Sequence, residues 1–186
     1  MTELGNDWQN KFKGFDKQSC SAASLGQVHK AISVDGKSLA CKLQYPDMQS
    51  AIEADLKQLK LAFNLYERAD NAISTKSIHK ELSARLAEEL DYKREASNLK
   101  LYSAILKSEK NVFVPDVIDN LSSDRLLTMT WLEGNKLLDW LEREPDLNSR
   151  NNVAVNMFKA WYIPFYFYGV IHGLSLIHIS EPTRPR

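Results

Sequence analysis

Alternating hydrophobic and polar positions between residues 27 and 44 predict two antiparallel strands. The first strand covers Gln27–Val34 and the second covers Ser38–Gln44, and the Asp-Gly step in the turn at residues 34–37 is a strong hairpin signal. One face of the second strand carries Leu39, Cys41 and Leu43. Lys42 lies on the other face with Ala40, because side chains alternate along a strand. A lysine near the middle of a strand needs a partner.

Apolar residues recur at three- and four-residue steps after Pro46 and predict an amphipathic helix over residues 46–69. They are Met48, Ile52, Leu56, Leu59, Phe63 and Tyr66. At about 100° per residue, these positions fall within an arc of roughly 80°. We expect this stripe to pack on the sheet rather than to lie on a membrane, because the outer face carries charges of both signs.

A second helical pattern covers residues 76–107, with Ser74 or Thr75 as its expected N-cap. Its apolar stripe changes face from Leu82, Leu86 and Leu90 to Leu99, Tyr102, Ile105 and Leu106. Glu95 lies along the centre of the second stripe, where a carboxylate is costly unless it is paired. Lys42 is the cation without an evident partner. We therefore predict a Lys42–Glu95 ion pair between strand and helix.

Strand-like segments return between residues 112 and 131, on both sides of a turn at residues 121–124. They complete a predicted α+β fold, in which an antiparallel sheet of about five strands packs against long helices. A short helix is expected over residues 135–143 and a longer one over 148–173. The longer helix is rich in aromatic residues and is expected to be buried on several sides, with Pro164 kinking or breaking it. A lipid or quinone site is the alternative interpretation of this cluster.

Composition narrows the class of protein. The chain has 186 residues, 44% of them hydrophobic, which suffices for a globular domain with a sizeable core. The 24 basic and 24 acidic residues cancel, so no nucleic-acid partner is expected. Cys20 and Cys41 have no metal-site spacing and suggest small buried thiols in a reducing compartment, with a disulfide as the alternative. Without an apolar run of membrane-span length or a signal-peptide core, a cytoplasmic or membrane-peripheral location is expected.

The segment before the hairpin has the spacing of a phosphate-binding loop. Protein kinases carry G-x-G-x-x-G-x-V before a strand with V-A-I-K, whose lysine binds phosphates and pairs with a helix glutamate. Here the loop positions hold Ser21, Ala23, Gly26 and Val28, and the strand positions hold Leu39, Ala40, Cys41 and Lys42. The segments SAASLGQVHKA and ACKLQYP resemble the UbiB-like family of atypical protein kinases, which is associated with ubiquinone biosynthesis and has an alanine-rich loop.

This resemblance implies a kinase-like small lobe that binds ATP or ADP. The implied nucleotide contacts are Ser21, Ala22, Ala23, Ser24, Gly26, Val28, Ala40, Lys42, Glu95, Met129, Trp131 and Leu132. Met129 takes the gatekeeper position, and residues 130–132 take the hinge whose backbone would contact adenine. In EELDYKREASN, Glu89 and Asp91 fit the E-x-D signature of the family. A solvated acidic helix face is the other interpretation of these two residues.

The resemblance also sets the expected domain organisation. Residues 1–14 are expected to be an N-terminal stub, 15–134 the kinase-like small lobe, and 135–173 the start of a helical large lobe. In the family, G-x-x-H-x-D-P-H-P-G-N then supplies a catalytic aspartate and a metal-binding asparagine, whereas here the match ends at Gly173. Residues 174–186 resemble a translated sequencing adapter and are left out of the expected fold. No catalytic or metal residue is therefore assigned, and Mg²⁺ is expected only in the complete protein.

Two functions follow as expectations. The first is the N-terminal fragment of a UbiB-type kinase or ATPase that binds ATP or ADP and supports ubiquinone biosynthesis. The second is a nucleotide-binding or protein- or lipid-interaction module without chemistry of its own. Nucleotide is the expected partner in the first case. Membrane lipid and ubiquinone-biosynthesis proteins are further candidate partners.

Overall fold

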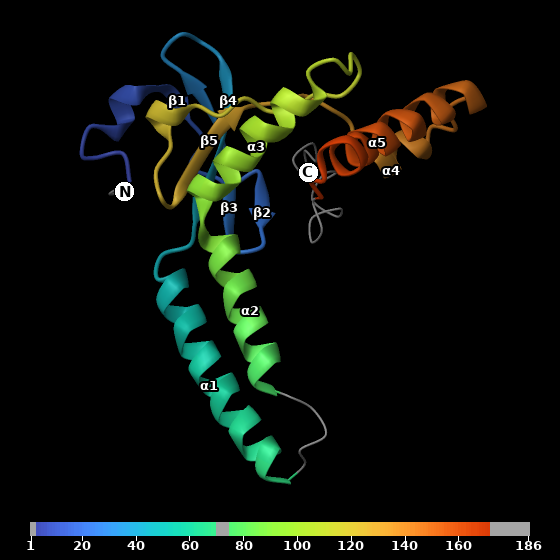
Figure 1. The fold of residues 1–186 in the computed structure, drawn as a ribbon. Coiled ribbons are helices and arrows are strands. Elements are labelled where there is room, and N and C mark those ends of the chain that lie inside the picture. The colour runs from blue at the N-terminus through green and yellow to red at the C-terminus, as the bar shows by residue number, and fades with distance from the viewer. Residues whose placement is uncertain (1–2, 70–74, 172–186) are drawn as a thin grey trace.

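A computed structural model describes residues 3–69 and 75–171 and contains a five-stranded antiparallel sheet (Figure 1). Its strands are β1 (Phe12–Phe15), β2 (Ser21–Ala23), β3 (Gly26–Ser33), β4 (Ser38–Gln44) and β5 (Leu126–Thr130). The strand order is β1-β3-β4-β5, and the short β2 also pairs with β3. The predicted α+β class, with its antiparallel sheet and long helices, is confirmed.

The helices take different places around this sheet. They are α1 (Met48–Ala69), α2 (Thr75–Leu90), α3 (Tyr92–Leu106), α4 (Leu137–Leu141) and α5 (Leu147–Tyr168), with short 3-10 turns η1 (Trp8–Lys11) and η2 (Asp119–Leu121). Figure 1 shows α3 beside the sheet, α1 and α2 projecting away from it as a hairpin, and α4 and α5 on the side of α3. An ion pair between Lys159 and Glu109 links α5 to the segment after α3.

The single helix predicted over residues 76–107 is wrong, because Asp91 divides it into α2 and α3. The Asp91 carboxylate accepts the backbone N–H of Arg94 at 2.9 Å and thereby caps α3. This break separates the two apolar stripes, which face different partners. Thr75 begins α2, and its buried hydroxyl donates to the Glu67 carboxylate. Ser74, the other expected cap, lies outside the described residues.

The expected packing of the first long helix on the sheet is also wrong. In the structure α1 packs against α2, where the ring of Phe63 lies 6.5 Å from the ring of His79. The helix begins at Met48 rather than at Pro46, after Asp47 adopts a positive φ of 58°. The apolar stripe of α1 packs against α2. The two amphipathic helices therefore shield their apolar faces against each other, away from the sheet.

β5 lies where the pattern placed the strand after the turn at residues 121–124, but the strand expected before that turn does not form. Residues 112–118 are irregular apart from one isolated bridge between Val117 and Met129, and η2 follows at residue 119. Pro115, which has no N–H for a ladder, interrupts that segment. Instead Ser21–Ala23, which was expected to be a loop, forms β2 because its backbone pairs with residues 26–28 of β3.

Two apolar clusters cover the two faces of the sheet. The first consists of Phe12, Ala31, Leu39, Cys41, Leu121 and Leu126, with Leu4 and Trp8 of the N-terminal segment packed against it. The second, which we call the α3-side core, consists of Tyr92, Leu127 and Met129, with Ala40, Ala96, Leu99 and Val117 at its edge. Because Lys42 shares the face of Ala40, the fold brings Lys42 under α3.

The aromatic helix α5 is more exposed than expected. It continues through the buried Pro164 to Tyr168 and ends at Gly169, which has the left-handed φ of 63° common at helix ends. Tyr166 and Phe167 are 64% and 68% exposed, so the expected burial on several sides is not found. Residues 172 and 173, the end of the predicted helix, lie outside the described residues. Among the described helices, none combines the length and apolar character needed to span a membrane.

Candidate nucleotide site

Lys42 and Glu95 form the predicted ion pair. The Lys42 ammonium donates to both carboxylate oxygens of Glu95, with each N–O distance 2.7 Å. The side chain of Lys42 is 20% exposed and that of Glu95 is 36% exposed. The pair is thus partly shielded by protein, and the ammonium remains close enough to the surface to meet an anionic ligand.

The local sequence explains this geometry. The alternation of β4 directs Lys42 toward α3 and directs Cys41 into the opposite core. The Asp91 cap starts α3, so that Glu95 lies in its first turn and on the face that carries Tyr92. The ring of Tyr92 lies beneath the Lys42 ammonium, 4.9 Å from ring centroid to Nζ.

An apolar strip of sheet adjoins the Lys42 ammonium. Val28 is the cross-strand neighbour of Lys42, and Met129 is the cross-strand neighbour of Ala40. Val28 and Ala40 are half-buried, whereas Met129 is 9% exposed and belongs to the α3-side core. Small and apolar side chains beside a cation offer a surface that suits a flat base next to phosphates. The structure therefore brings together the residues expected from β3, β4 and β5.

The expected hinge follows β5 directly. Trp131 and Leu132 come after the last strand residue, Thr130, and the backbone N–H of Trp131 donates to the Ser38 carbonyl at 3.0 Å. This bond fixes the start of the segment against β4. The assignment of the hinge to adenine contacts stays a prediction.

The alanine-rich segment forms a tight hairpin with β3 at the Lys42 end of β4, away from the hinge. Ser21, Ala22 and Ala23 make up β2, and Ser24 begins the turn into β3. The Ser24 hydroxyl donates to the Glu89 carboxylate at 3.5 Å, a long contact that joins the hairpin to the end of α2.

Gly26, at the start of β3, is required by close packing. A Cβ at this position would lie 2.3 Å from the Leu43 carbonyl oxygen and 3.1 Å from the Tyr92 hydroxyl oxygen. No side chain fits there unless the backbone of β4 moves. The one glycine retained at the three glycine positions of the loop pattern thus has a structural role in the contact between β3, β4 and α3.

The E-x-D residues are separated by the helix break. Glu89 lies exposed on the last turn of α2, while Asp91 accepts the Arg94 N–H as the N-cap of α3. Both residues are exposed to solvent, but Asp91 is the N-cap of α3 and does not share a helix face with Glu89. Any ligand role for these two carboxylates stays a prediction.

Two residues near the site were missed by the sequence analysis. Lys30 shares the face of Val28, and its ammonium lies 4.6 Å from the Trp131 ring centroid and 3.1 Å from the Glu133 carboxylate. Because Lys30 is two residues from Val28 on one strand, the alternation could have predicted that both lie on the same face. Tyr92 lies inside the quoted E-x-D segment, but its burial under Lys42 depends on the helix break and had no local signal.

Protonation states follow from burial. Burial raises the pKa of the Cys41 thiol to about 11, although its hydrogen bond from Thr128 acts in the other direction. Burial also raises the pKa of Tyr92, and the nearby Glu95 and Glu89 carboxylates raise it further. Cys41 and Tyr92 therefore stay protonated and uncharged near neutral pH.

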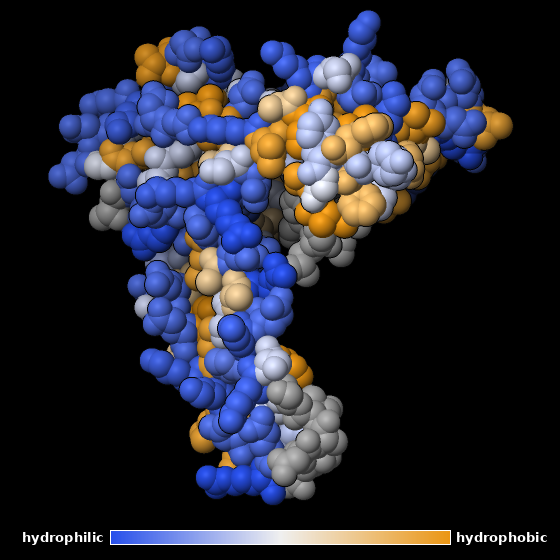
Figure 2. Space-filling model, viewed as in Figure 1, coloured by the Kyte–Doolittle hydropathy of each residue, from blue (hydrophilic) through white to orange (hydrophobic). Residues whose placement is uncertain are grey.

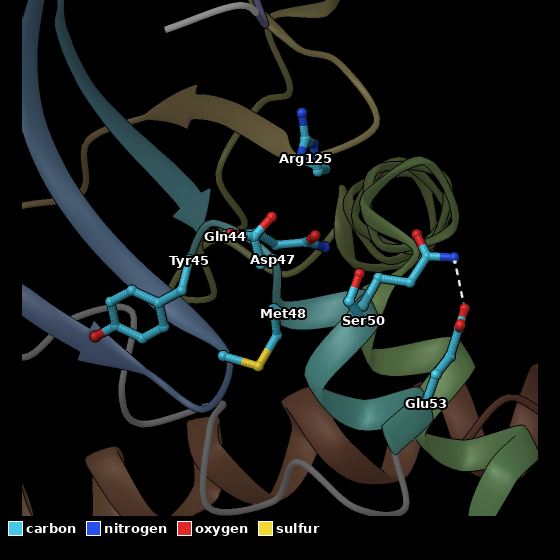
Figure 3. Close-up of a pocket in the computed structure, with 8 residues that line it drawn as sticks. Gln44, Tyr45, Asp47, Met48, Ser50, Glu53 and Arg125 are labelled. Atoms are coloured by element: carbon cyan, nitrogen blue, oxygen red, sulfur yellow. Dashed lines mark hydrogen bonds between the residues drawn. The ribbon is translucent and has the colours of Figure 1, made fainter. Parts of the chain in front are cut away.

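Two surface hollows lie elsewhere. One has a volume of about 180 Å³ and lies at the junction of β4 and α1 (Figure 3). Its lining residues are Gln44, Tyr45, Asp47, Met48, Gln49, Ser50, Glu53 and Arg125. The second, of about 260 Å³, lies after α3 and includes Leu106, Val112 and Phe113. Neither is lined by a residue of the expected nucleotide site. Among residues 3–69 and 75–171, no group of three or more His, Cys, Asp or Glu side chains is arranged to hold a metal ion.

Comparison with known proteins identifies the family of the chain. Residues 1–173 match the ABC1 atypical kinase-like domain, and the chain therefore belongs to that family. The mitochondrial atypical kinase coq-8 of Caenorhabditis elegans is 35% identical over 144 residues, which are 77% of this chain and 19% of that protein. The mitochondrial atypical kinase COQ8 of Saccharomyces cerevisiae is 34% identical over 157 residues, which are 84% of this chain and 31% of that protein.

A solved structure supports the fold assignment. The complex of Rv3197 with erythromycin from Mycobacterium tuberculosis superimposes with a TM-score of 0.81 at 27% identity. The match covers 96% of this chain and 44% of the solved one. The chain thus spans less than half of the solved relative and under a third of the two curated relatives.

Proposed function

We propose that this chain forms the nucleotide-binding small lobe of an ATP-dependent atypical kinase or ATPase. The observation that carries the proposal is the Lys42 ammonium, held by both oxygens of Glu95 at 2.7 Å on the sheet face of Ala40. In kinases, a strand lysine paired in this way with a helix glutamate contacts the nucleotide phosphates. The ATP-dependent activity would belong to the complete protein.

The side chains present fit a nucleotide. Lys42 can neutralise phosphate charge. The apolar strip of Val28, Ala40 and Met129 can hold the base, and the hinge at residues 130–132 can contact the edge of the base. Bound ATP supplies the phosphoryl group, while these residues orient it and exclude water. We propose that the metal-binding residues for Mg²⁺ belong to the complete protein. A role in ubiquinone biosynthesis and a cytoplasmic or membrane-peripheral location are parts of this proposal, whereas the coq-8 and COQ8 relatives are named as mitochondrial.

Titration with ADP and ATP tests the proposal on the full chain. Lys42→Met should weaken nucleotide binding by about tenfold or more, since loss of a phosphate contact of about 1.4 kcal/mol corresponds to a factor of ten. Glu95→Gln should weaken it less, because the lysine charge remains. The matched control is Lys100→Met, which removes another lysine paired with a carboxylate, that of Asp119, on the exposed surface of α3. Equal affinities for the Lys42 and Lys100 variants would reject the nucleotide site.

A lipid-interaction module is the second candidate, and the exposed aromatic side chains of α5 favour it. Phe158, Tyr166 and Phe167 are between 57% and 68% exposed. Under this alternative the chain binds vesicles without any dependence on nucleotide, and Phe158→Gln weakens that binding while Lys42→Met does not. Nucleotide binding that requires Lys42, with no vesicle binding, would reject the lipid-module alternative.

A further inference from the structure

Tyr92 is the most completely enclosed side chain at the candidate site. It is the first residue of α3 and is 2% exposed. Its ring lies 4.9 Å from the Lys42 ammonium, and Glu95 is three residues later on the same helix face. One turn of α3 thus touches the Lys42 ammonium twice, once with an aromatic ring and once with a carboxylate.

The hydroxyl of Tyr92 does not account for the contact with the Lys42 ammonium. It is buried and has no hydrogen-bond partner among the described residues. It lies in the space next to Gly26, where an added Cβ would be 3.1 Å from the hydroxyl oxygen. A buried hydroxyl without a partner disfavours folding, so the ring rather than the hydroxyl accounts for the contact with Lys42.

We propose that Tyr92 is a positioning residue whose ring fixes the Lys42 ammonium for the nucleotide phosphates. The negative face of an aromatic ring attracts a cation within about 6 Å of its centroid, and this attraction strengthens when water is excluded. Glu95 alone would leave the four-carbon side chain of Lys42 free to follow the carboxylate, which is itself 36% exposed. The enclosed ring of Tyr92 gives the ammonium a second, rigid contact. This inference rests on the nucleotide site proposed above.

A change in ring electrostatics at constant shape separates this role from packing. Two variants of the full chain are compared, Tyr92→Phe and Tyr92→pentafluorophenylalanine. Both lack the hydroxyl and have similar shapes, but fluorination reverses the charge distribution of the ring face. We expect the fluorinated variant to bind ADP about three- to tenfold more weakly than the Phe variant, which corresponds to the range of cation–π attractions at partly shielded sites. Pentafluorophenylalanine at Phe12, in the core on the opposite face of the sheet, is the control for fluorination itself.

The outcomes are distinct. Weaker ADP binding by the fluorinated variant than by the Phe variant supports the proposal, provided that this difference in affinity disappears when Lys42 is also replaced by Met. Thermal unfolding must also show that all variants are folded. Equal ADP affinities of the two Tyr92 variants, with clear binding by the wild-type chain, would overturn the role of Tyr92 while leaving the nucleotide site intact. If the wild-type chain does not bind ADP, the proposed function fails instead. In that case the unfolding temperatures of the two Tyr92 variants, each with and without Lys42→Met, test the ring contact. If the effect of fluorination on stability is the same with and without Lys42, the ring contact is overturned.

Discussion

At the residue scale, Gly26 is fixed by what surrounds it. The Leu43 carbonyl and the Tyr92 hydroxyl occupy the space that any Cβ would need. Gly26→Ala should therefore destabilise the chain by about 1 to 3 kcal/mol, the range of overpacked cores, and lower its unfolding temperature. It should also weaken nucleotide binding, because it displaces Tyr92 from Lys42.

Gly14→Ala is the matched control for this substitution. A Cβ at Gly14 in β1 would meet only Ile32 at the ordinary distance of 3.8 Å. This variant should be as stable as wild type or slightly more so, since alanine restricts the unfolded chain. Equal unfolding temperatures for the Gly26 and Gly14 variants would show that the contact at Gly26 relaxes without cost.

Cys41 gives a prediction about pH. Burial raises the thiol pKa from its ordinary value of 9.0 to about 11 in the folded chain. Well below pH 9 the thiol is protonated in both states, so Cys41 adds no pH dependence there. As pH rises from 9 toward 11, the unfolded chain loses the proton first, and folding stability should fall.

Alkylation checks the burial of Cys41 that raises its pKa. Cys41 should resist iodoacetamide at pH 8 in the folded chain and react after denaturation, whereas the less buried Cys20 should react first. Mass spectrometry of the peptides identifies the modified thiol. Faster labelling of Cys41 than of Cys20 in the folded chain would contradict its burial.

At the scale of elements, the cap of α3 determines the candidate site. Asp91 accepts the Arg94 N–H at 2.9 Å, and Tyr92 and Glu95 follow in the first turn. Asp91→Ala should destabilise the chain by about 1 kcal/mol and weaken nucleotide binding, because the first turn of α3 loosens. Fluorescence titration with ADP and thermal unfolding measure the two effects.

The cap of α5 provides the comparison. The Asp146 carboxylate accepts the Ser149 N–H at 3.0 Å in the same geometry, but Asp146 lies outside the candidate site. Asp146→Ala should lower stability and leave ADP affinity unchanged. An equal loss of affinity in both variants would mean that general destabilisation, not the position of Glu95, explains the effect.

The elements also show what the sequence could predict. The β3–β4 hairpin depends on local alternation and an Asp-Gly turn, and both are visible in the sequence. The Lys42–Glu95 pair could be predicted because the strand alternation and the helix periodicity each place a charge on a face that is partly shielded from solvent. The partner of an amphipathic stripe is not a local property, so α1 was assigned to the sheet although it packs on α2. β2 was missed because its three residues acquire their strand geometry only by pairing with β3.

At the scale of the molecule, the chain contains the residues that are expected to contact nucleotide, but it spans only part of the length of its relatives. We expect it to bind nucleotide weakly and not to transfer a phosphoryl group, because the resemblance places the catalytic aspartate and metal-binding asparagine after Gly173. Phosphoryl transfer depends on positioning and on metal neutralisation of the phosphate oxygens. Mg²⁺-dependent ATP turnover should therefore be absent from residues 1–173 and should appear in a chain that carries the family motif after Gly173. Comparable turnover by both would mean that the active site has been placed wrongly.

The apolar surface of α5 gives the last prediction. Val155, Phe158 and Tyr166 are between 53% and 64% exposed, and in Figure 2 apolar side chains gather over this part of the molecule. Contiguous apolar surface of this kind favours association in water. The chain should therefore form oligomers as its concentration rises, and Phe158→Gln with Tyr166→Gln should shift it toward monomer without loss of helix.

Sedimentation velocity measures this shift toward monomer. The control is Val34→Gln, which removes a 68% exposed apolar side chain of the β3–β4 turn. A chain that stays monomeric at every concentration would show that this face does not drive association.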